Sequence, residues 1–340
     1  MQFLAEYGLF LAKALTLVVA ILLVAGNLFA MARASRAQSG NHLEVRDVGA
    51  RLRELGDALN DELLHEDERK KLGKARKAEE KAKRKARSRG VAPRARVFVL
   101  SFEGDLAAHA VANLREEISA VLQVARKGDE ILLRLESAGG LVHAYGLAAS
   151  QLVRIRSRGL KLTVAVDKVA ASGGYLMACV ADHIIAAPFA VLGSIGVVAQ
   201  IPNFNRLLKK NEIDLELHTA GEFKRTLTLF GENTEAGRVK FREDLEETHT
   251  LFKAFVAAHR PALDIARVAT GEHWFGTRAA ELKLCDELSS SDDYLLQRVE
   301  DADVFEVQYH LRKPWSERIG LGMAALASSF GRKALTPTVD

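Results

Sequence analysis

The chain has 340 residues, of which 48% are hydrophobic, so it is long enough for one large domain or two ordinary ones with appendages. Its two cysteines, Cys179 and Cys285, exclude a disulfide-rich scaffold. The net charge of +4 is uneven, because residues 69–96 hold fourteen Lys and Arg against two Glu and carry +12, which leaves −8 for the rest. The basic character is therefore a property of one segment.

Residues 14–31 form an apolar run that is long enough to cross a bilayer. A cleaved signal peptide would have a shorter apolar core after a basic start, whereas here Glu6 precedes the first cation, Lys13. A buried helix of a soluble domain is the other alternative. We predict a single transmembrane anchor within residues 1–35.

A linker arm is predicted over residues 36–95. It begins with a short strand at 43–46 and continues as an amphipathic helix over 48–63, where apolar residues recur every three or four positions. Residues 66–89 are almost entirely Lys, Arg, Glu and Ala, which predicts a charged spacer, helical or disordered, on an acidic surface. Anionic lipid is the expected partner; nucleic acid is not, because no aromatic residues are interleaved to stack on bases.

From residue 96 onwards, predicted strands and helices alternate. Strands are predicted at 97–100, 130–135, 160–166, 183–186, 191–199 and 305–310, and helices at 109–126, 141–156, 175–181, 234–258, 263–270 and 277–284. This alternation predicts an α/β domain with a largely parallel sheet over residues 96–312. Residues 313–340 are expected to form a C-terminal tail.

Ser172 lies in a turn of small residues, Ala171-Ser172-Gly173-Gly174, between the strand at 160–166 and the helix at 175–181. At the start of a helix, free backbone N–H groups and the positive end of the helix dipole favour a developing oxyanion. Ser172 is therefore a candidate nucleophile. The alternative is an ordinary N-cap serine, which needs no chemistry.

A serine nucleophile needs a base that takes its proton. His183, His218 and His273 lie in strand-like or apolar contexts, which favours structural or surface roles for them. The sequence contains no HExxH motif and no cysteine pair at the spacing of metal ligands, so a metal site is not expected.

Lysine is the other base available, provided that burial lowers its pKa towards neutrality. Lys224 follows an alternating, strand-like run at 213–218 and a glycine turn. The residues alone do not choose between Lys224 and Lys168.

Two glycine-rich turns complete the candidate site. Gly139-Gly140 lies between a strand and a helix, so its N–H groups could join that of Gly173 in an oxyanion hole, although such pairs also occur in ordinary turns. Ser194, in the segment Gly193-Ser194-Ile195-Gly196, could orient a lysine amine or cap a backbone group.

The order of these motifs resembles the signal peptide peptidase A family of Ser-Lys serine proteases. The shared features are strand-Ser-x-Gly-Gly-helix, Ala-Ala-Ser-Gly-Gly-Tyr, Gly-Ser-Ile-Gly-Val-Val and Gly-x-Phe-Lys, together with GEFKRTLTLFGE at 221–232 and ATGEHWFG at 269–276. The resemblance covers residues 4–288. It implies a crotonase/ClpP-like spiral of repeated ββα units, and a ring in which serine and lysine can come from neighbouring protomers.

The resemblance also implies a role for each candidate residue: nucleophile Ser172, general base Lys224, lysine-orienting hydroxyl Ser194, and oxyanion donors Gly139 and Gly173. One departure concerns Ala138, which stands where the family usually has proline. Without the preset φ of proline we expect a softer loop and an intact site.

The function implied is that of a membrane-anchored serine endopeptidase without a cofactor, acting on unfolded or apolar peptides such as cleaved signal peptides. Two alternatives stay open: a crotonase-like enzyme that binds the thioester of an acyl-CoA at the glycine turns, and a non-catalytic membrane scaffold that acts through the basic arm. The resemblance implies the bacterial inner membrane with a periplasmic peptidase domain, whereas the basic arm favours the cytoplasmic side by the positive-inside rule.

Overall fold

The computed structural model describes Lys13, Thr16 and residues 41–88 and 94–311. The chain divides into two compact units, Met1–Leu43 with Tyr309–Asp340 and Glu44–Gln308. All the elements that surround Ser172 belong to the second unit.

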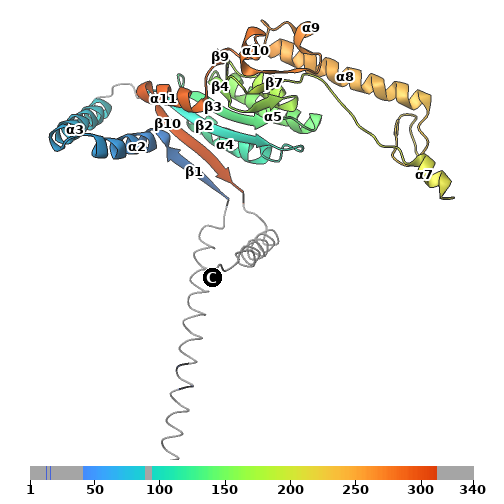
Figure 1. Cartoon of the computed structure of the whole chain (residues 1–340), viewed down its shortest axis with the longest axis horizontal. Coiled ribbons are helices and arrows are strands. Elements are labelled where there is room, and N and C mark those ends of the chain that lie inside the picture. Colours follow the sequence, from blue (N-terminus) through green and yellow to red (C-terminus); the bar gives the residue numbers. More distant parts are fainter. Residues whose placement is uncertain (1–12, 14–15, 17–40, 89–93, 312–340) are drawn as a thin grey trace, which may run out of the picture. The chain divides into compact units, whose positions relative to one another are not determined.

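A ten-stranded sheet organises the second unit (Figure 1). Its main path runs β1-β10-β2-β3-β4-β6-β9, while β5 pairs with β3 and β7, and β7 also pairs with β8. The pairings among β2 to β7, β9 and β10 are parallel, whereas β8 runs antiparallel to β7. The strands are β1 (His42–Asp47), β2 (Arg96–Gly104), β3 (Glu130–Ser137), β4 (Lys161–Val166), β5 (Val169–Ala171), β6 (His183–Ala186), β7 (Val191–Gly193), β8 (His273–Phe275), β9 (Glu287–Leu288) and β10 (Asp303–His310).

Helices connect most of these strands, as the parallel pairing requires. They are α2 (Val48–Leu63), α3 (Glu66–Ser88), α4 (Val111–Val124), α5 (Val142–Ser157), α6 (Gly173–Ala178), α7 (Asn205–Lys210), α8 (Glu235–His259), α9 (Ile265–Val268), α10 (Gly276–Glu281) and α11 (Ser291–Asp301).

Strand β2 shows how the sequence builds the layers around the sheet. Phe98, Leu100 and Phe102 face a large apolar core to which α4, α5 and α6 contribute, whereas Val97 and Val99 face a smaller core that includes residues of α11. Successive side chains of a strand point to opposite faces, so an unbroken apolar run is what a strand covered on both sides needs.

The predicted α/β class is confirmed, and the spiral of ββα units stays a prediction. The charged spacer is helical, as α3. The apolar run at 14–31 lies outside the described residues except for Thr16, and the tail at 313–340 lies wholly outside them. Among the described residues, none of the helices combines the length and the apolarity that crossing a membrane requires.

The structure differs from two strand predictions. The strand-like run at 213–218 pairs with no strand among the described residues, and its apolar members Ile213, Leu215 and Leu217 are about half exposed, at 52%, 47% and 52%. The strand at 191–199 ends early, as β7, because Gly193 and Ser194 have φ angles of +101° and +53°, which turn the backbone out of the extended conformation.

Asp129 fixes the start of β2 beside the start of β3. Its carboxylate accepts hydrogen bonds from the Arg96 N–H (3.0 Å) and guanidinium (Nε, 3.1 Å) and from the Arg126 N–H (2.8 Å). Burial alone would raise the pKa of Asp129, but these hydrogen bonds from Arg96 and Arg126 lower it below its ordinary value.

We therefore expect Asp129→Asn to reduce the free energy of unfolding at neutral pH by about 1–3 kcal/mol. A carboxyl whose folded pKa is lowered stabilises the protein above its unfolded pKa, near 3.9, and this contribution is lost as the pH falls towards the folded value. Urea denaturation should therefore show a difference between wild type and variant that is full at pH 6–7 and shrinks below about pH 4. A difference independent of pH would contradict this account.

Candidate active site

Three neighbouring loops bring most of the predicted site residues together. Strands β3, β5 and β7 lie side by side in parallel, with Ser137 opposite Ala170 and Ala171 opposite Gly193. The loops that follow their carboxyl ends therefore meet at one edge of the sheet, which is the edge where α/β folds place their ligands. These loops carry the Gly139 turn, Ser172 and Ser194.

Ser172 is held in a strained turn between β5 and α6. Its φ and ψ are 51° and −119°, a conformation that residues other than glycine rarely adopt. Its N–H donates to the Gly193 carbonyl at 2.8 Å. Its side chain makes no capping hydrogen bond to α6, so the alternative of an ordinary N-cap serine does not account for the hydroxyl.

Gly139 packs directly against the serine turn. A Cβ atom at this position would lie 2.6 Å from the Gly173 nitrogen and 2.7 Å from Ser172 Cβ, and its φ of +92° also favours glycine. Its N–H donates to Ser137 Oγ at 3.1 Å, and the neighbouring Gly140 lines the cavity beside Ser172. The loop therefore approaches closely enough to act with Gly173, and Gly140 is the glycine of the pair that faces the cavity.

A cavity of about 800 Å³ opens beside Ser172. Ser172, Gly173 and Ser194 all line it, as the shared role predicted for them requires. The rest of the wall is mainly apolar and comes from α5, α6, the segment after β7, and α8; its larger members are Tyr145, Leu176, Val197, Val198, Leu251, Phe252 and Phe255.

Lys224 does not line this cavity. It lies in the exposed segment between α7 and α8, in a turn where its N–H donates to the Gly221 carbonyl. The geometry within one chain thus brings together the serine and glycine residues and leaves the lysine elsewhere.

Lys168, the other candidate base, is held by a surface ion pair. Its Nζ lies 2.8 Å from Glu136 Oε2, and both side chains are largely exposed. The hydrogen bond and the negative charge of Glu136 raise the pKa of Lys168, so this amine is protonated at neutral pH and cannot accept a proton.

We expect Lys168→Met to leave the reaction of Ser172 with a serine-directed probe within about twofold of wild type, because an exposed ion pair contributes little. The measurement is the rate of covalent labelling at several pH values. A loss of labelling in this variant would instead indicate that Lys168 is the general base for Ser172.

His249 is a cavity residue that the sequence did not reveal. It lies on α8 and lines the cavity, and its Nε2 is buried without a hydrogen-bond partner among the described residues. The three histidines considered as bases from the sequence do not line the cavity: His183 faces Glu287, and His218 and His273 are exposed. The helical spacing of His249, Phe252 and Phe255 was the signal available, since residues three or four apart share a face.

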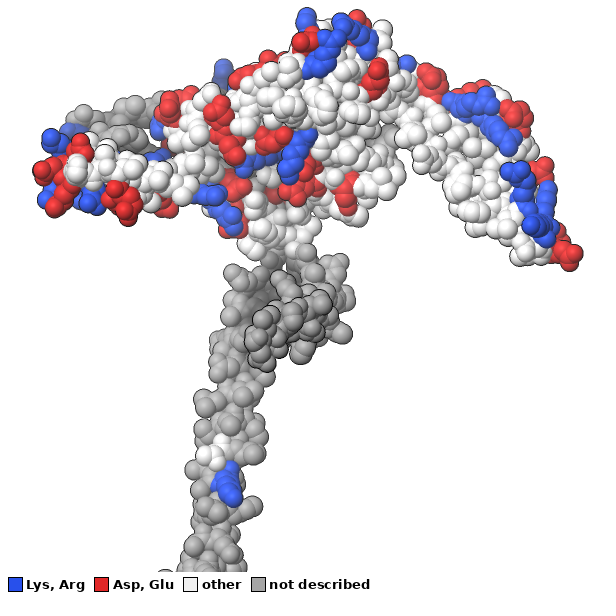
Figure 2. All heavy atoms as spheres, in the orientation of Figure 1, with Lys and Arg blue, Asp and Glu red and all other residues white. Residues whose placement is uncertain are grey.

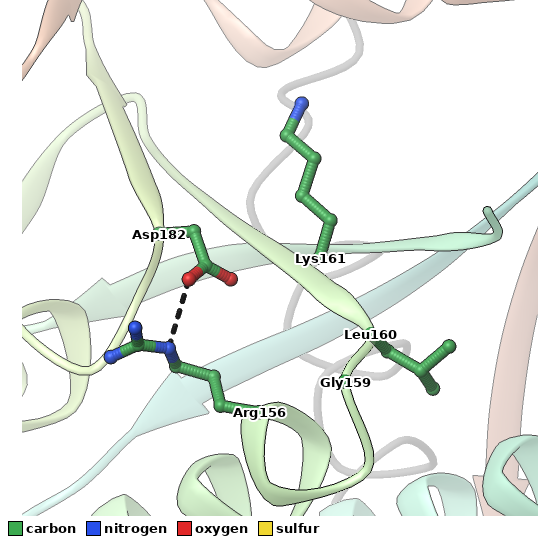
Figure 3. Close-up of a pocket in the computed structure, with 5 residues that line it drawn as sticks. All are labelled: Arg156, Gly159, Leu160, Lys161 and Asp182. Carbon is green, nitrogen blue, oxygen red and sulfur yellow. Dashed lines mark ion pairs between the residues drawn. The ribbon is translucent and has the colours of Figure 1, made fainter. Parts of the chain in front are cut away.

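A second hollow of about 410 Å³ lies at the opposite edge of the sheet, where β4 begins (Figure 3). Its charged residues already have partners, because Arg156 pairs with Asp182 and Lys161 with Glu130. Within the described part of the chain, no group of three or more His, Cys, Asp or Glu could hold a metal ion. The cavity beside Ser172 is therefore the better candidate for chemistry.

Two protein-family models match most of the chain. The model of the peptidase family S49 N-terminal domain matches residues 2–152, and that of peptidase family S49 matches residues 154–304. A protein of Haemophilus influenzae named "Probable protease SohB" is 51% identical over 340 residues, which cover 97% of this chain and 93% of that protein. A protein of the same name from Buchnera aphidicola is 61% identical over 223 residues, 66% of each chain.

Among solved structures, a 1510-N membrane-bound stomatin-specific protease overlays with a TM-score of 0.41 at 12% identity, covering 67% of this chain and 97% of that one. The family assignment rests on the two family models and on the relatives that are similar in sequence. The chain belongs to peptidase family S49.

Proposed function

We propose that the protein is a serine endopeptidase in which Ser172 is the nucleophile and Lys224 the general base. Neutral Lys224 accepts the Ser172 Oγ proton as Oγ bonds to the peptide carbonyl carbon. The resulting oxyanion accepts hydrogen bonds from Gly173 N–H and from the Gly139–Gly140 loop. Lys224 then returns the proton to the leaving amine, and water hydrolyses the acyl-enzyme. The proposal is carried by the position of Ser172: its backbone is strained, its side chain makes no capping hydrogen bond, and it lies beside a mainly apolar cavity.

We further propose that Lys224 acts on the serine of a neighbouring protomer in a homo-oligomeric ring. The segment between β7 and α8 exposes many large apolar side chains: Ile201, Phe204, Leu207, Ile213, Leu215, Leu217, Phe223, Leu229 and Phe230. Figure 2 shows charged side chains along the outer side of α8 and a largely uncharged surface beneath it. Exposed apolar surface of this kind marks interfaces, and a second copy would cover it while delivering Lys224. Ser194 would then orient the amine.

The proposed substrates are unfolded or apolar peptides such as signal-peptide remnants, because the cavity wall beside Ser172 is mainly apolar. We also propose a bacterial inner-membrane protein anchored through residues 1–35, with α3 on anionic lipid and the peptidase domain on the periplasmic side. The support for the lipid contact is the charge of residues 69–96.

The test is covalent labelling of the full-length, detergent-solubilised protein with a fluorophosphonate at mildly alkaline pH, where more of the lysine is neutral. Wild type should be labelled, Ser172→Ala should not, and Ser157→Ala, which alters an exposed serine outside the cavity, should label like wild type. Absence of labelling in wild type would contradict the proposal. Acyl-CoA binding in that case would favour the crotonase-like alternative, and loss of biological role only on removal of residues 69–96 would favour the scaffold.

A further inference from the structure

A continuous hydrogen-bond chain runs through the loop beside Ser172. Gly139 N–H meets Ser137 Oγ at 3.1 Å, Ser137 Oγ meets Tyr145 Oη at 2.5 Å, and Tyr145 Oη meets the Asp105 carbonyl at 2.8 Å. A backbone N–H can only donate and a carbonyl can only accept. The protons therefore all point one way, with Ser137 accepting from Gly139 and donating to Tyr145, and Tyr145 donating to Asp105.

This chain is closed off from solvent. Ser137 is 2% exposed and Tyr145 0%. Gly104 makes room for it, because a Cβ there would lie 2.5 Å from both hydroxyl oxygens. Burial raises the pKa of Tyr145 more than its hydrogen bond from Ser137 lowers it, so the phenol keeps the proton that it donates.

Tyr145 also supports the other half of the site. A Cβ at Gly173 would lie 2.4 Å from Tyr145 Cγ, so the tyrosine ring packs directly against the backbone that follows Ser172. One side chain thus touches the serine turn through its ring and holds the glycine loop through its hydroxyl. Ala138, between Ser137 and Gly139, adds no ring constraint to the loop.

We propose that Tyr145 and Ser137 are positioning residues that fix the separation between the Gly173 N–H and the Gly139–Gly140 loop, and so the geometry of the oxyanion hole. The proposal rests on the proposed function, because an oxyanion forms only if Ser172 attacks a carbonyl or its analogue. Neither hydroxyl reacts with substrate. Their effect is on where the oxyanion donors lie.

The experiment measures fluorophosphonate labelling of the full-length protein at several probe concentrations, which separates the maximal rate, kinact, from the probe affinity, KI. Misplaced catalytic groups lower rates steeply, so Tyr145→Phe and Ser137→Ala should each lower kinact about tenfold, with KI within about twofold. Because the two hydroxyls form one chain, the double variant should lose about tenfold and not about a hundredfold.

Tyr175→Phe is the matched control. It also removes one buried tyrosine hydroxyl from one backbone carbonyl, that of Leu284 at 3.0 Å, without touching the glycine loop. It should lower the melting temperature as Tyr145→Phe does and leave kinact unchanged.

The outcomes separate the two proposals. Unlabelled wild type, or Ser172→Ala labelled as strongly as wild type, would overturn the proposed function and this inference with it. Labelled wild type with Tyr145→Phe and Tyr175→Phe at equal kinact would overturn the positioning role alone, as would losses that multiply in the double variant. Should Tyr145→Phe fail to fold, Ser137→Ala decides, since an unchanged kinact in that variant is equally incompatible with the chain.

Discussion

Lys224→Ala is expected to lower the reaction rate of Ser172, with a fluorophosphonate or a peptide, by about a thousandfold, although Lys224 does not line the cavity of its own chain. The reason is that Ser172 is unreactive until a base takes its proton. Lys224→Arg should be as inactive, because a guanidinium keeps its charge and cannot accept a proton. The measurement is the labelling rate of each variant at mildly alkaline pH.

Mixing two inactive variants tests where the lysine comes from. In co-expressed, differently tagged subunits, Lys224→Ala keeps Ser172 and Ser172→Ala keeps Lys224. If the lysine acts on a neighbouring protomer, label should reappear on the Lys224→Ala subunit. The control replaces the Ser172→Ala partner with a subunit that carries both substitutions, and it should stay unlabelled.

Two results would contradict this prediction in different ways. Inactive mixtures, with each single variant inactive, would place Lys224 beside the serine of its own chain. Labelling retained in Lys224→Ala and lost in His249→Ala would make His249 the base, since it lines the cavity with a buried Nε2 that has no partner among the described residues.

The sequence predicted the serine turn because its signal is local. A β-branched strand, the Ala171-Ser172-Gly173-Gly174 turn and an apolar helix specify one backbone path, and the structure places Ser172 there between β5 and α6. Gly139 could be predicted for the same reason, since it follows the carboxyl end of β3. Parallel pairing then brings the two turns together without any further information.

The failures concern residues whose environment is not local. The alternating run at 213–218 has the period of a strand, but a strand needs a partner, and none among the described residues supplies one. His249 was missed because it reaches the cavity only through the packing of α8 against α6, far away in the sequence. Nor did the sequence choose between Lys168 and Lys224, because the ion pair that keeps Lys168 protonated joins the turn after β4 to a residue of β3, 32 positions earlier in the chain.

Gly139→Ala is expected to lower the labelling rate by about a hundredfold or more, because a displacement of about 1 Å at a reacting group has that effect. The added Cβ would lie 2.7 Å from Ser172 Cβ and 2.8 Å from the Ala171 carbonyl, so the serine turn itself must move. Backbone strain is a separate cost, since the φ of Gly139 is +92°. Alanine in a left-handed conformation costs about 1–2 kcal/mol.

Gly128→Ala isolates that strain. Gly128 has nearly the same φ, +95°, but a Cβ there would meet nothing within 4 Å. Both variants should therefore lose stability, measured by urea denaturation, while only Gly139→Ala loses labelling. Equal labelling rates in the two variants would mean that Gly139 is needed only for the backbone conformation of its own turn and not for the reaction of Ser172. A hundredfold difference at similar stability would instead show that its closeness to Ser172 serves catalysis, because strain common to both variants cannot produce it.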